Sequence, residues 1–535
     1  MILSSERTET FSITTPLFYV NDLPHIGSAY PTMAADALAR FNRLRGKPVL
    51  FVTGTDEHGQ KIQQAAEGRG RSPQSHCDEM VAGFELLWQK LNIQHDRFIR
   101  TTTPRHEAIV RAFFQRVWER GDIYSGHQKG WYCVSCEEFK EERELLVGNR
   151  CPIHTNKEVE WRDEQNYFFR LSNYQQSLEI LYQERPEFIQ PEARRNEVLS
   201  FVKQGLRDFS ISRVNVKWGI PMPVDPNHTL YVWFDALVGY MTALLDPDTE
   251  PTLENAIARW WPINVHLIGK DILRFHAVYW PAMLMSAGLP LPSCIFGHGF
   301  LTKDGLKMGK SMGNTLDPIG LVQHYGADAV RYYFLKEIEF GGDGDFNESR
   351  FVNVVNANLA NDLGNLLNRT LKMVHKYCGA RVPVLAEQDV VAETPLKAIA
   401  STLEAKVSQA YDVMAFGEAC EAVLVLVRAG NKYIDEQAPW SLFKQQEKTL
   451  AEQVLYSVLE SVRLAAYLLS PIIPDTSTAI YQQLGFLVNF NDKTLINASI
   501  SYTTHSSWGV LPANQPIGDP QPVFRRLELL ETVSS

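Results

Sequence analysis

Residues 11–53 read FSITTPLFYVNDLPHIGSAYPTMAADALARFNRLRGKPVLFVT, in which two apolar runs flank a segment with helical spacing. The runs 11–20 and 48–53 are rich in β-branched and aromatic residues, so each predicts a buried strand. Apolar residues between 29 and 44 recur at helical intervals, and a second helix is expected over 72–91. This alternation predicts an α/β fold with a doubly wound, Rossmann-like parallel sheet. The functional site of such a fold lies beyond the carboxyl ends of its strands.

The remainder of the chain divides this α/β pattern into two halves and adds a helical region. Strands are expected again at 230–234, 265–269 and 294–298, after a cysteine-rich and charge-rich interruption. Later residues show helical spacing without strand-like alternation, which predicts a helical bundle. The expected segments are the first half of the catalytic domain (1–120), an inserted connective domain (121–213), the second half of the catalytic domain (214–347), the helical bundle (348–485) and a C-terminal tail (486–535).

Composition limits the classes of protein that the chain fits. Its 535 residues are 45% hydrophobic and exceed the size of one compact domain. The formal net charge of −10 argues against nonspecific coating of nucleic acid, so DNA is not an expected partner and RNA binding should be local. Seven cysteines in so long a chain do not indicate a disulfide scaffold. We find no pattern of a membrane span or targeting segment, so we expect a soluble, cytoplasmic protein without a membrane partner.

The loop between the first predicted strand and helix contains the motif P-H-I-G-S, with His25, Gly27 and Ser28 at the start of the helix. A helix N-terminus offers backbone N–H groups and a partial positive charge, which suit an anion such as triphosphate. Gly27 leaves room for a nucleotide to approach closely. By itself this short motif is also compatible with a purely structural turn.

A second candidate motif, GLKMGKSMGN, occupies residues 305–314. Lys307 and Lys310 are three residues apart in a glycine-rich loop that can fold over a polyanion. Mobile ammonium groups suit the oxygens of a leaving pyrophosphate. A solvated basic loop is the alternative when this motif is considered alone.

Together the two motifs are much more specific than either one. Their order, context and separation resemble the HIGH and KMSKS signatures of class I aminoacyl-tRNA synthetases. Two positions depart from those signatures: Ser28 replaces the last His of HIGH, and Gly309 replaces the first Ser of KMSKS. Ser28 can donate a hydrogen bond but carries no charge, whereas Gly309 mainly alters the stiffness of the loop.

The resemblance implies an ATP site in which the protein aligns substrates and stabilises charge. Catalysis is expected from His25, Lys307 and Lys310, with Mg²⁺ accompanying ATP. Lys270 and Asp271 follow a predicted strand and are expected on the ATP side of the cleft, although a solvent-facing pair is equally compatible. The expected ATP ligands are His25, Gly27, Ser28, Lys270, Asp271, Lys307, Lys310 and Ser311.

A cluster of cysteines in the expected insert has the spacing of a metal site. Cys133 and Cys136 form one C-x2-C pair, and Cys151 and His154 form a second pair fourteen residues later. Three cysteines and one histidine make a closed tetrahedral set that is typical of structural Zn²⁺. We expect one structural zinc per chain in a zinc knuckle, with buried unliganded cysteines as the alternative.

The choice among synthetases depends on YVWFDALVGY, residues 231–240, and LIGKDILRFH, residues 267–276, which both follow predicted strands. They closely resemble methionyl-tRNA synthetases, and the resemblance continues in matching order through nearly the whole chain. Asp56 would hold the substrate's α-ammonium as a charge-assisted pair, with a cap for the following helix as the alternative. Large aromatic walls suit a polarisable thioether. The implied methionine ligands are Leu17, Tyr19, Asp56, Trp233, Ala236, Leu237, Tyr240, Ile272 and His276.

The helical region carries NKYIDEQAPW, residues 431–440. In the family that the chain resembles, the residues matching Pro439 and Trp440 meet the anticodon, and an asparagine matching Asn361 reads a base. Many members have Arg where this chain has Asn365. Stacking of an unpaired base on Trp440 would contribute about 1–3 kcal/mol; a core tryptophan is the alternative.

The resemblance implies the methionine–tRNA ligase reaction. The methionine carboxylate attacks the α-phosphate of ATP, giving methionyl-adenylate and pyrophosphate. The 3′ terminal adenosine of tRNA(Met), including initiator tRNA, then takes up the methionine. This chemistry needs no side-chain nucleophile. Residues 486–535 leave little room for an additional dimerising domain, so we expect a monomer.

Several other classes of protein share part of these features. Synthetases for leucine, isoleucine and valine usually carry a longer editing insertion, and a cysteinyl enzyme would use its zinc to select the substrate. An inactive RNA-binding paralogue would not need His25, Asp56, Lys307 and Lys310. A simple nucleotidylyltransferase would share the HIGH-like loop but would not need the helical region.

Overall fold

A six-stranded parallel sheet forms the centre of the catalytic region, in the order β3-β2-β1-β12-β13-β7. The strand order reverses between β1 and β12, so the sheet is doubly wound, as predicted. The crevice beyond the carboxyl ends of these two strands is therefore the expected site. The strands are β1 (Phe11–Tyr19), β2 (Val49–Asp56), β3 (Arg97–Arg100), β7 (Ile189–Gln190), β12 (Val265–Gly269) and β13 (Cys294–His298).

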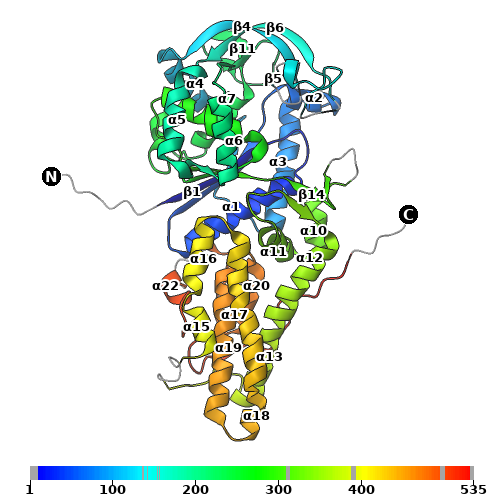
Figure 1. Ribbon diagram of the computed structural model, residues 1–535, viewed down its shortest axis with the longest axis vertical. Coiled ribbons are helices and arrows are strands. Elements are labelled where there is room, and N and C mark those ends of the chain that lie inside the picture. Colours follow the sequence, from blue (N-terminus) through cyan, green and yellow to red (C-terminus); the bar gives the residue numbers. More distant parts are fainter. Residues whose placement is uncertain are drawn as a thin grey trace, which may run out of the picture.

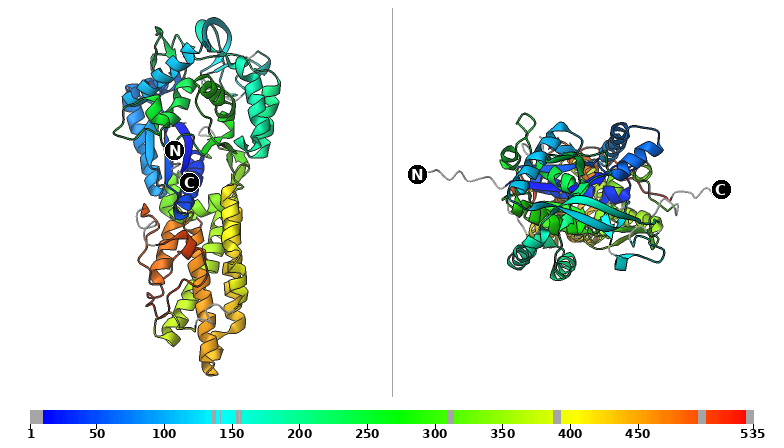
Figure 2. Two further views of the ribbon diagram at one scale, coloured as in Figure 1. Left: turned by 90° about the vertical axis from the view of Figure 1, so that its left-hand side faces the viewer. Right: turned by 90° about the horizontal axis from the view of Figure 1, so that it is seen from above.

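This computed structural model describes residues 10–134, 138–140, 142–152, 155, 157–308, 314–386, 393–493 and 500–529. The molecule is elongated, with the α/β region at one end and the helical bundle at the other (Figure 1). The perpendicular view in Figure 2 shows the same two-part arrangement. Within these described ranges, no helix is long and apolar enough to cross a membrane.

Helices cover both faces of the parallel sheet. Successive residues of a strand point to opposite faces, so each strand contacts both layers of helices. Phe51 of β2 belongs to one buried cluster, together with α1 and α3, whereas its neighbour Val52 belongs to a second cluster, with α4, α7 and α9. The predicted start of α3 is confirmed, since the Ser72 side chain accepts from the N–H of Ser75. The helices of this region are α1 (Ile26–Leu44), α2 (Gln60–Gly68), α3 (Pro73–Lys90), α4 (Pro104–Glu119), α5 (Gln175–Glu184), α6 (Glu192–Lys203), α7 (Val232–Thr242), α8 (Leu253–Ile257), α9 (Trp280–Ser286), α10 (Pro318–Tyr325) and α11 (Ala327–Glu337).

The expected insert, residues 121–213, forms a four-stranded antiparallel sheet in the order β5-β4-β6-β8. Its long strands β4 and β6 arch over the catalytic region (Figure 1). Part of the same interval returns to the main sheet, because β7 pairs with β13. The insert is therefore not a separate body over its whole length. Its strands are β4 (Ile123–Cys133), β5 (Glu138–Lys140), β6 (Glu160–Phe169) and β8 (Phe209–Ser210).

The strand predicted at 230–234 is wrong beyond its first residue. β11 (Asp225–Leu230), which pairs with β9 (Ser212–Arg213) and β10 (Pro221–Met222), ends at Leu230, and α7 begins at Val232. The β-branched and aromatic composition of the motif favoured a strand locally. Nearly every residue of α7 is buried, so its apolar run hides the helical period that would have identified it.

The C-terminal part of the chain, from α12 onward, is a helical bundle, as predicted. Residues 500–529 lie against it, since the side chain of Asn356 exchanges hydrogen bonds of 2.9 and 2.8 Å with the backbone of Leu527. The tail, about which the sequence indicated little, thus contributes to this core. The helices are α12 (Glu348–Val355), the π-helix η7 (Asn356–Gly364), α13 (Asn365–Cys378), α15 (Pro395–Ala400), α16 (Leu403–Asp412), α17 (Phe416–Gln437), α18 (Pro439–Lys444), α19 (Lys448–Leu469), α20 (Pro474–Gln483) and α22 (Tyr502–His505).

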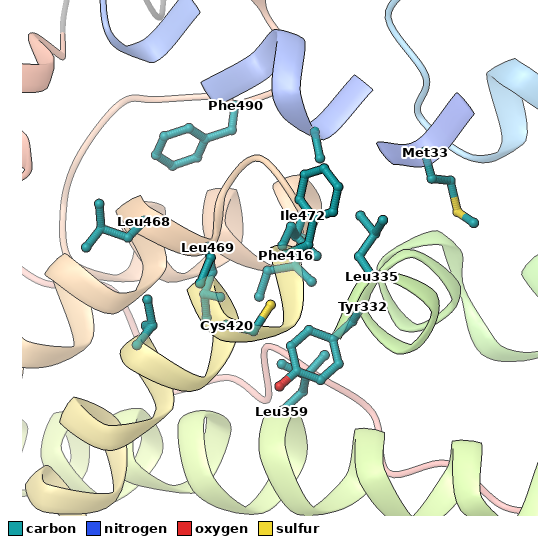
Figure 3. Close-up of a cluster of buried hydrophobic side chains, with 14 of the residues drawn as sticks. Met33, Tyr332, Leu335, Leu359, Phe416, Cys420, Leu468, Leu469, Ile472 and Phe490 are labelled. Atoms are coloured by element: carbon teal, nitrogen blue, oxygen red, sulfur yellow. The ribbon is translucent and has the colours of Figure 1, made fainter. Parts of the chain in front are cut away.

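One continuous core joins the two parts of the molecule. Met33 of α1 and Leu335 of α11 belong to the same buried cluster as Phe416 of α17 and the loop residue Ile472, part of which is drawn in Figure 3. A buried ionic group lies at the same junction: Asp36 contacts Arg40 and Arg331 at 2.7 Å each. Arg331 also donates to the carbonyl oxygens of Pro471 and Ile472, at 2.7 and 2.9 Å, which fixes the bundle to the catalytic region.

Candidate active site

The structure brings seven of the predicted methionine ligands together around one cavity. Four lie on one face of α7 at spacings of three and four residues, so their side chains share a direction. β1 and the segment after β12 supply the other three, at the point where the strand order reverses. The lining residues are Leu17, Trp233, Ala236, Leu237, Tyr240, Ile272 and His276.

The floor of this cavity is polar but uncharged. The Nδ1 atom of His276 lies 3.0 Å from the carbonyl oxygen of Ile272, so Nδ1 carries the proton and donates. The Nε2 atom then accepts from the hydroxyl of Tyr240 at 2.7 Å. Burial lowers the pKa of His276 to about 4, which keeps the ring neutral at neutral pH. Such a floor suits a neutral thioether rather than a charged side chain.

The aromatic wall of the cavity is held rigid by a residue that the sequence did not single out. Trp233 stacks on Phe275, with ring centroids 4.0 Å apart and an interplanar angle of 7°. The only feature of the sequence that could have pointed to Phe275 is its position directly before His276. A second missed residue is Arg213, which is buried and lies 4.0 Å over the ring of Tyr231, just before α7.

Tyr19 and Asp56 lie side by side at the carboxyl ends of β1 and β2, where they are register partners. Neither belongs to the group of side chains that lines the cavity, but Leu17, two residues before Tyr19, does. Asp56 is buried, and the N-cap of the following helix α2 is Gly59. The alternative role of Asp56 as a helix cap therefore does not fit.

His25 is the N-cap of α1, and its Nδ1 atom accepts from the backbone N–H of Gly27 at 3.0 Å. Because Nδ1 accepts, a neutral ring carries its proton on Nε2, the atom that can donate to an anion. Gly27 has a second reason to be glycine: a Cβ there would lie 2.8 Å from the His25 ring.

The first turn of α1 offers fewer donors than the sequence predicted. The N–H of Gly27 is bonded to the His25 ring, and the N–H of Ser28 donates to the His25 carbonyl oxygen at 2.9 Å. Ser28 itself is buried. The partial positive charge of the helix end remains, so an anion here is stabilised by the helix dipole and by His25.

Lys270 and Asp271 follow β12, as expected, but they do not form a pair with each other. Both carboxylate oxygens of Asp343 accept from the Lys270 ammonium at 2.7 Å, and this contact lowers the pKa of Asp343. The Asp271 side chain folds over Gly269, where a Cβ would lie 2.5 Å from its carboxylate. Lys270 is partly buried and Asp271 is exposed, directly after the carboxyl end of β12.

The predicted lysine loop follows a hairpin of β14 (Leu301–Lys303) and β15 (Leu306–Lys307). β14 also pairs with β16 (Gly344–Phe346), and Asp345 accepts from the N–H of Gly305 at 2.7 Å, which fixes the hairpin turn. The backbone of Lys307 ends β15. The side chain of Lys307 and all of Lys310 and Ser311 lie outside the described residues.

Two of the four predicted zinc ligands are described. Cys133, at the end of β4, and Cys151 are both buried and share one small cluster with Val159. Cys136 and His154 lie outside the described residues. In the part of the chain that the structure covers, no three His, Cys, Asp or Glu side chains form a metal-binding group. The two predicted zinc ligands that the structure describes, Cys133 and Cys151, therefore lie in one cluster.

The predicted anticodon residues Pro439 and Trp440 belong to α18, which lies at the far end of the bundle (Figure 1). Asn361 and Asn365 are exposed and four residues apart on the continuous helix formed by η7 and α13. Trp440 is half-buried rather than a core residue, whereas Pro439 is buried at the first position of α18. Arg369 was missed by the sequence reasoning; it lies one turn after Asn365 and contacts Asp435 at 2.5 Å.

The doubly wound fold, the cavity and the helix-capping histidine define a class I aminoacyl-tRNA synthetase. A family model described as "tRNA synthetases class I (M)" matches residues 11–159 and 146–371. A second model, "Anticodon binding domain of methionyl tRNA ligase", matches residues 385–528. The chain belongs to the methionyl-tRNA synthetase family.

Individual relatives are similar over the whole length of the chain. The methionine–tRNA ligase of Nostoc sp. is 69% identical over 533 residues, with 100% of both chains covered. The chloroplastic/mitochondrial methionine–tRNA ligase of Arabidopsis thaliana is 54% identical, covering 98% of this chain and 84% of the relative. The methionyl-tRNA synthetase of Mycobacterium tuberculosis in complex with methionyl-adenylate has a TM-score of 0.88 at 41% identity, covering 96% and 99% of the two chains.

Proposed function

We propose that this chain is an ATP-dependent methionine–tRNA ligase whose cavity beneath α7 binds the methionine side chain. The observation that carries this proposal is the neutral Tyr240–His276 floor inside an aromatic wall. Asp56 binds the α-ammonium beside Tyr19, at the ends of β1 and β2. A charged side chain would lose its hydration in this cavity without gaining a counter-charge from the floor, which disfavours lysine or glutamate.

The proposed activation step places ATP along the start of α1, accompanied by Mg²⁺. A methionine carboxylate oxygen attacks the α-phosphorus, and the bond to the pyrophosphate oxygen breaks. The Nε2–H of His25 donates to phosphate oxygen as charge develops, while Lys307 and Lys310 stabilise the leaving pyrophosphate. Gly27, Ser28, Lys270, Asp271 and Ser311 complete the proposed ATP contacts. Alignment and charge stabilisation are sufficient for this chemistry.

The proposed RNA partner is tRNA(Met), including the initiator. Its 3′ terminal adenosine hydroxyl attacks the carbonyl carbon of methionyl-adenylate, and AMP leaves. At the other end of the molecule, an unpaired anticodon base stacks on Trp440 beside Pro439, and Asn361 and Asn365 supply amide groups that can hydrogen-bond to base edges. The half-buried placement of Trp440 supports this role.

The donor set in the insert fits a structural zinc ion. Cys133 and Cys151, one from each predicted pair, are buried in one cluster, and Cys136 and His154 would complete the tetrahedral set. A bound zinc ion would cross-link the two turns that carry these ligand pairs. No step of the reaction needs it.

The remaining expectations concern the protein as a whole. We propose a cytoplasmic monomer that divides at the predicted boundaries 1–120, 121–213, 214–347, 348–485 and 486–535. The bacterial relatives support the cytoplasmic setting. Light scattering coupled to size-exclusion chromatography tests the monomer directly.

The proposed function is tested by ATP–pyrophosphate exchange with the purified protein and each of the twenty amino acids in turn. Exchange should depend on methionine and should collapse in a Lys310→Ala variant. Exchange driven by a different amino acid would overturn the assignment of the cavity. Exchange without any amino acid would favour a nucleotidylyltransferase.

A further inference from the structure

The two faces of α7 have opposite chemical characters. One face lines the methionine cavity with Trp233 and Tyr240, two turns apart. With 3.6 residues per turn, Asp235 and Thr242 lie on the opposite face, against α4. Asp235 is 1% exposed, although a lone buried carboxylate is costly. Its position calls for a reason beyond packing.

Asp235 binds two histidines at once. Its Oδ2 lies 2.6 Å from the Nδ1 atom of His58, and its Oδ1 lies 2.5 Å from the Nε2 atom of His106. Burial alone would raise the pKa of Asp235, but the charges and hydrogen bonds of the two histidines outweigh it and lower the pKa to about 2. The carboxylate is therefore ionised and accepts from both rings. The other ring nitrogen of His106 lies 3.0 Å from the hydroxyl of Thr242.

One of these histidines belongs to the turn that carries Asp56. The carboxylate of Glu57 accepts from the guanidinium of Arg100 at 2.7 and 3.0 Å, and Glu57 is fully buried. The backbone around His58 is held by Trp218, whose indole N–H donates to the Glu57 carbonyl and whose own carbonyl accepts from the N–H of Gly59 at 3.0 Å. The turn is thus anchored to β3 and to the loop before β10, and only the His58–Asp235 contact ties it to α7 through a side-chain hydrogen bond among the described residues.

We infer that Asp235 is a positioning residue that sets the separation between the α-ammonium site at Asp56 and the side-chain cavity under α7. His58 ties the Asp56 turn to the back of α7, and His106 ties the same carboxylate to α4. The site for the α-ammonium group and the cavity for the side chain are then both positioned by the same buried carboxylate. This inference rests on the proposed role of Asp56 and adds a determinant of selectivity that does not touch the substrate.

Fixing this separation makes the site sensitive to the length of the amino acid. A methionine whose side chain fills the cavity can contact Asp56 only if the separation between the Asp56 turn and α7 is unchanged. Small displacements of reacting groups are costly for catalysis. Loosening the link should weaken methionine binding and favour shorter or longer analogues relative to methionine. ATP binds along α1 and does not use this link.

Asp235→Asn is the first test, by ATP–pyrophosphate exchange. We expect KM for methionine to rise about tenfold or more, with KM for ATP changing by less than about twofold. The ratio of kcat/KM for methionine over homocysteine should fall. Equal changes in both KM values, or no change in the methionine KM, would overturn the inference.

A pair of matched substitutions distinguishes positioning from general damage, even if Asp235→Asn fails to fold. The amide nitrogen of Asn occupies roughly the place of Nδ1 in histidine, and that of Gln roughly the place of Nε2. His58→Asn should therefore keep the donor to Asp235 and a near-normal methionine KM, whereas His58→Gln should not. The order reverses at position 106, where His106→Gln should be the better variant. The inference is wrong if Asn and Gln behave alike at both positions.

Asp122→Asn is the matched control, because Asp122, at the start of the insert, is also buried and accepts from Tyr174 and from Ser286 at the end of α9. It should lower thermal stability without changing the methionine KM. Failure of the proposed function is recognised separately: the wild-type protein would then lack methionine-dependent exchange, or Asp56→Ala would leave the methionine KM unchanged.

Discussion

The methionine cavity and the proposed anticodon face hold their polar groups in opposite environments. Tyr240 and His276 are buried and hydrogen-bonded to each other, whereas Asn361 and Asn365 are exposed on the helical bundle. A small amino acid can be enclosed, so the cavity loses its water and recognises shape and polarity together. An RNA loop needs an open surface, where stacking and hydrogen bonds compete with water. Substitutions should therefore cost more in the cavity than on the anticodon face.

The largest effect is expected for Asp56→Ala. Losing a buried charge-assisted contact to the α-ammonium should lower kcat/KM for methionine about 100-fold, or about 3 kcal/mol. ATP–pyrophosphate exchange over a range of methionine concentrations measures this effect. A loss of less than about threefold would contradict the role of Asp56 and reduce the contrast between the two ends.

Trp440→Ala should show the strongest effect at the anticodon end. Loss of one stacked base should cost about 2 kcal/mol in kcat/KM for tRNA(Met), while ATP–pyrophosphate exchange stays normal. Aminoacylation assays with Trp440→Phe as the conservative partner provide the control. Equal losses in exchange and aminoacylation would mean that Trp440 acts through the fold rather than through RNA.

The neutral floor of the cavity also predicts a dependence of stability on pH. Burial lowers the pKa of His276 to about 4, so the unfolded chain binds a proton more readily than the folded protein. Stability should fall as the pH drops below the unfolded value near 6.5, with His276 contributing about 1.4 kcal/mol per pH unit down to about pH 4. Urea unfolding at pH 6.5 and 5.5 should show a smaller difference in His276→Gln than in the wild type. An identical pH dependence in both proteins would show that His276 is charged or exposed.

The smallest effect is expected for Asn365→Ala, because an exposed amide contributes one hydrogen bond in competition with water. We expect a loss of about 1 kcal/mol in kcat/KM for tRNA(Met). Arg369→Ala is the informative comparison, since Arg369 lies one turn further along α13. Aminoacylation with both variants ranks the two side chains, and a larger loss for Asn365→Ala than for Trp440→Ala would reverse the proposed order on this face.

The sequence predicted most of the fold because its strands and helices carry strong local patterns. The first strand, α1, the second strand and α3 were confirmed, since caps and apolar spacing are encoded within each segment. The α7 segment was mistaken for a strand at its start because a helix buried on both sides shows no polar face.

The residues of the candidate site also differ in whether the sequence alone could identify them. Tyr240 and His276 lie in motifs that resemble a known family, so they could be named from the sequence. The contact of His58 with Asp235 joins residues 177 positions apart, and neither residue has a local pattern that indicates a partner. Side-chain contacts between distant segments depend on the assembled fold, which explains why this network was not predicted.

The helix α1 extends from the proposed ATP site to the junction with the helical bundle. It begins at Ile26, directly after the N-cap His25 beside the proposed phosphates, and its 19 residues extend for about 28 Å. Midway along it, Asp36 holds Arg331, which is bonded to the loop entering α20. A chimaera that exchanges the helical bundle for that of a relative keeps Asp36 and Arg331, so the new bundle must present backbone carbonyls where Pro471 and Ile472 now accept from Arg331. A graft cut near residue 348 that lacks these carbonyls would leave N–H donors of the buried Arg331 guanidinium without acceptors.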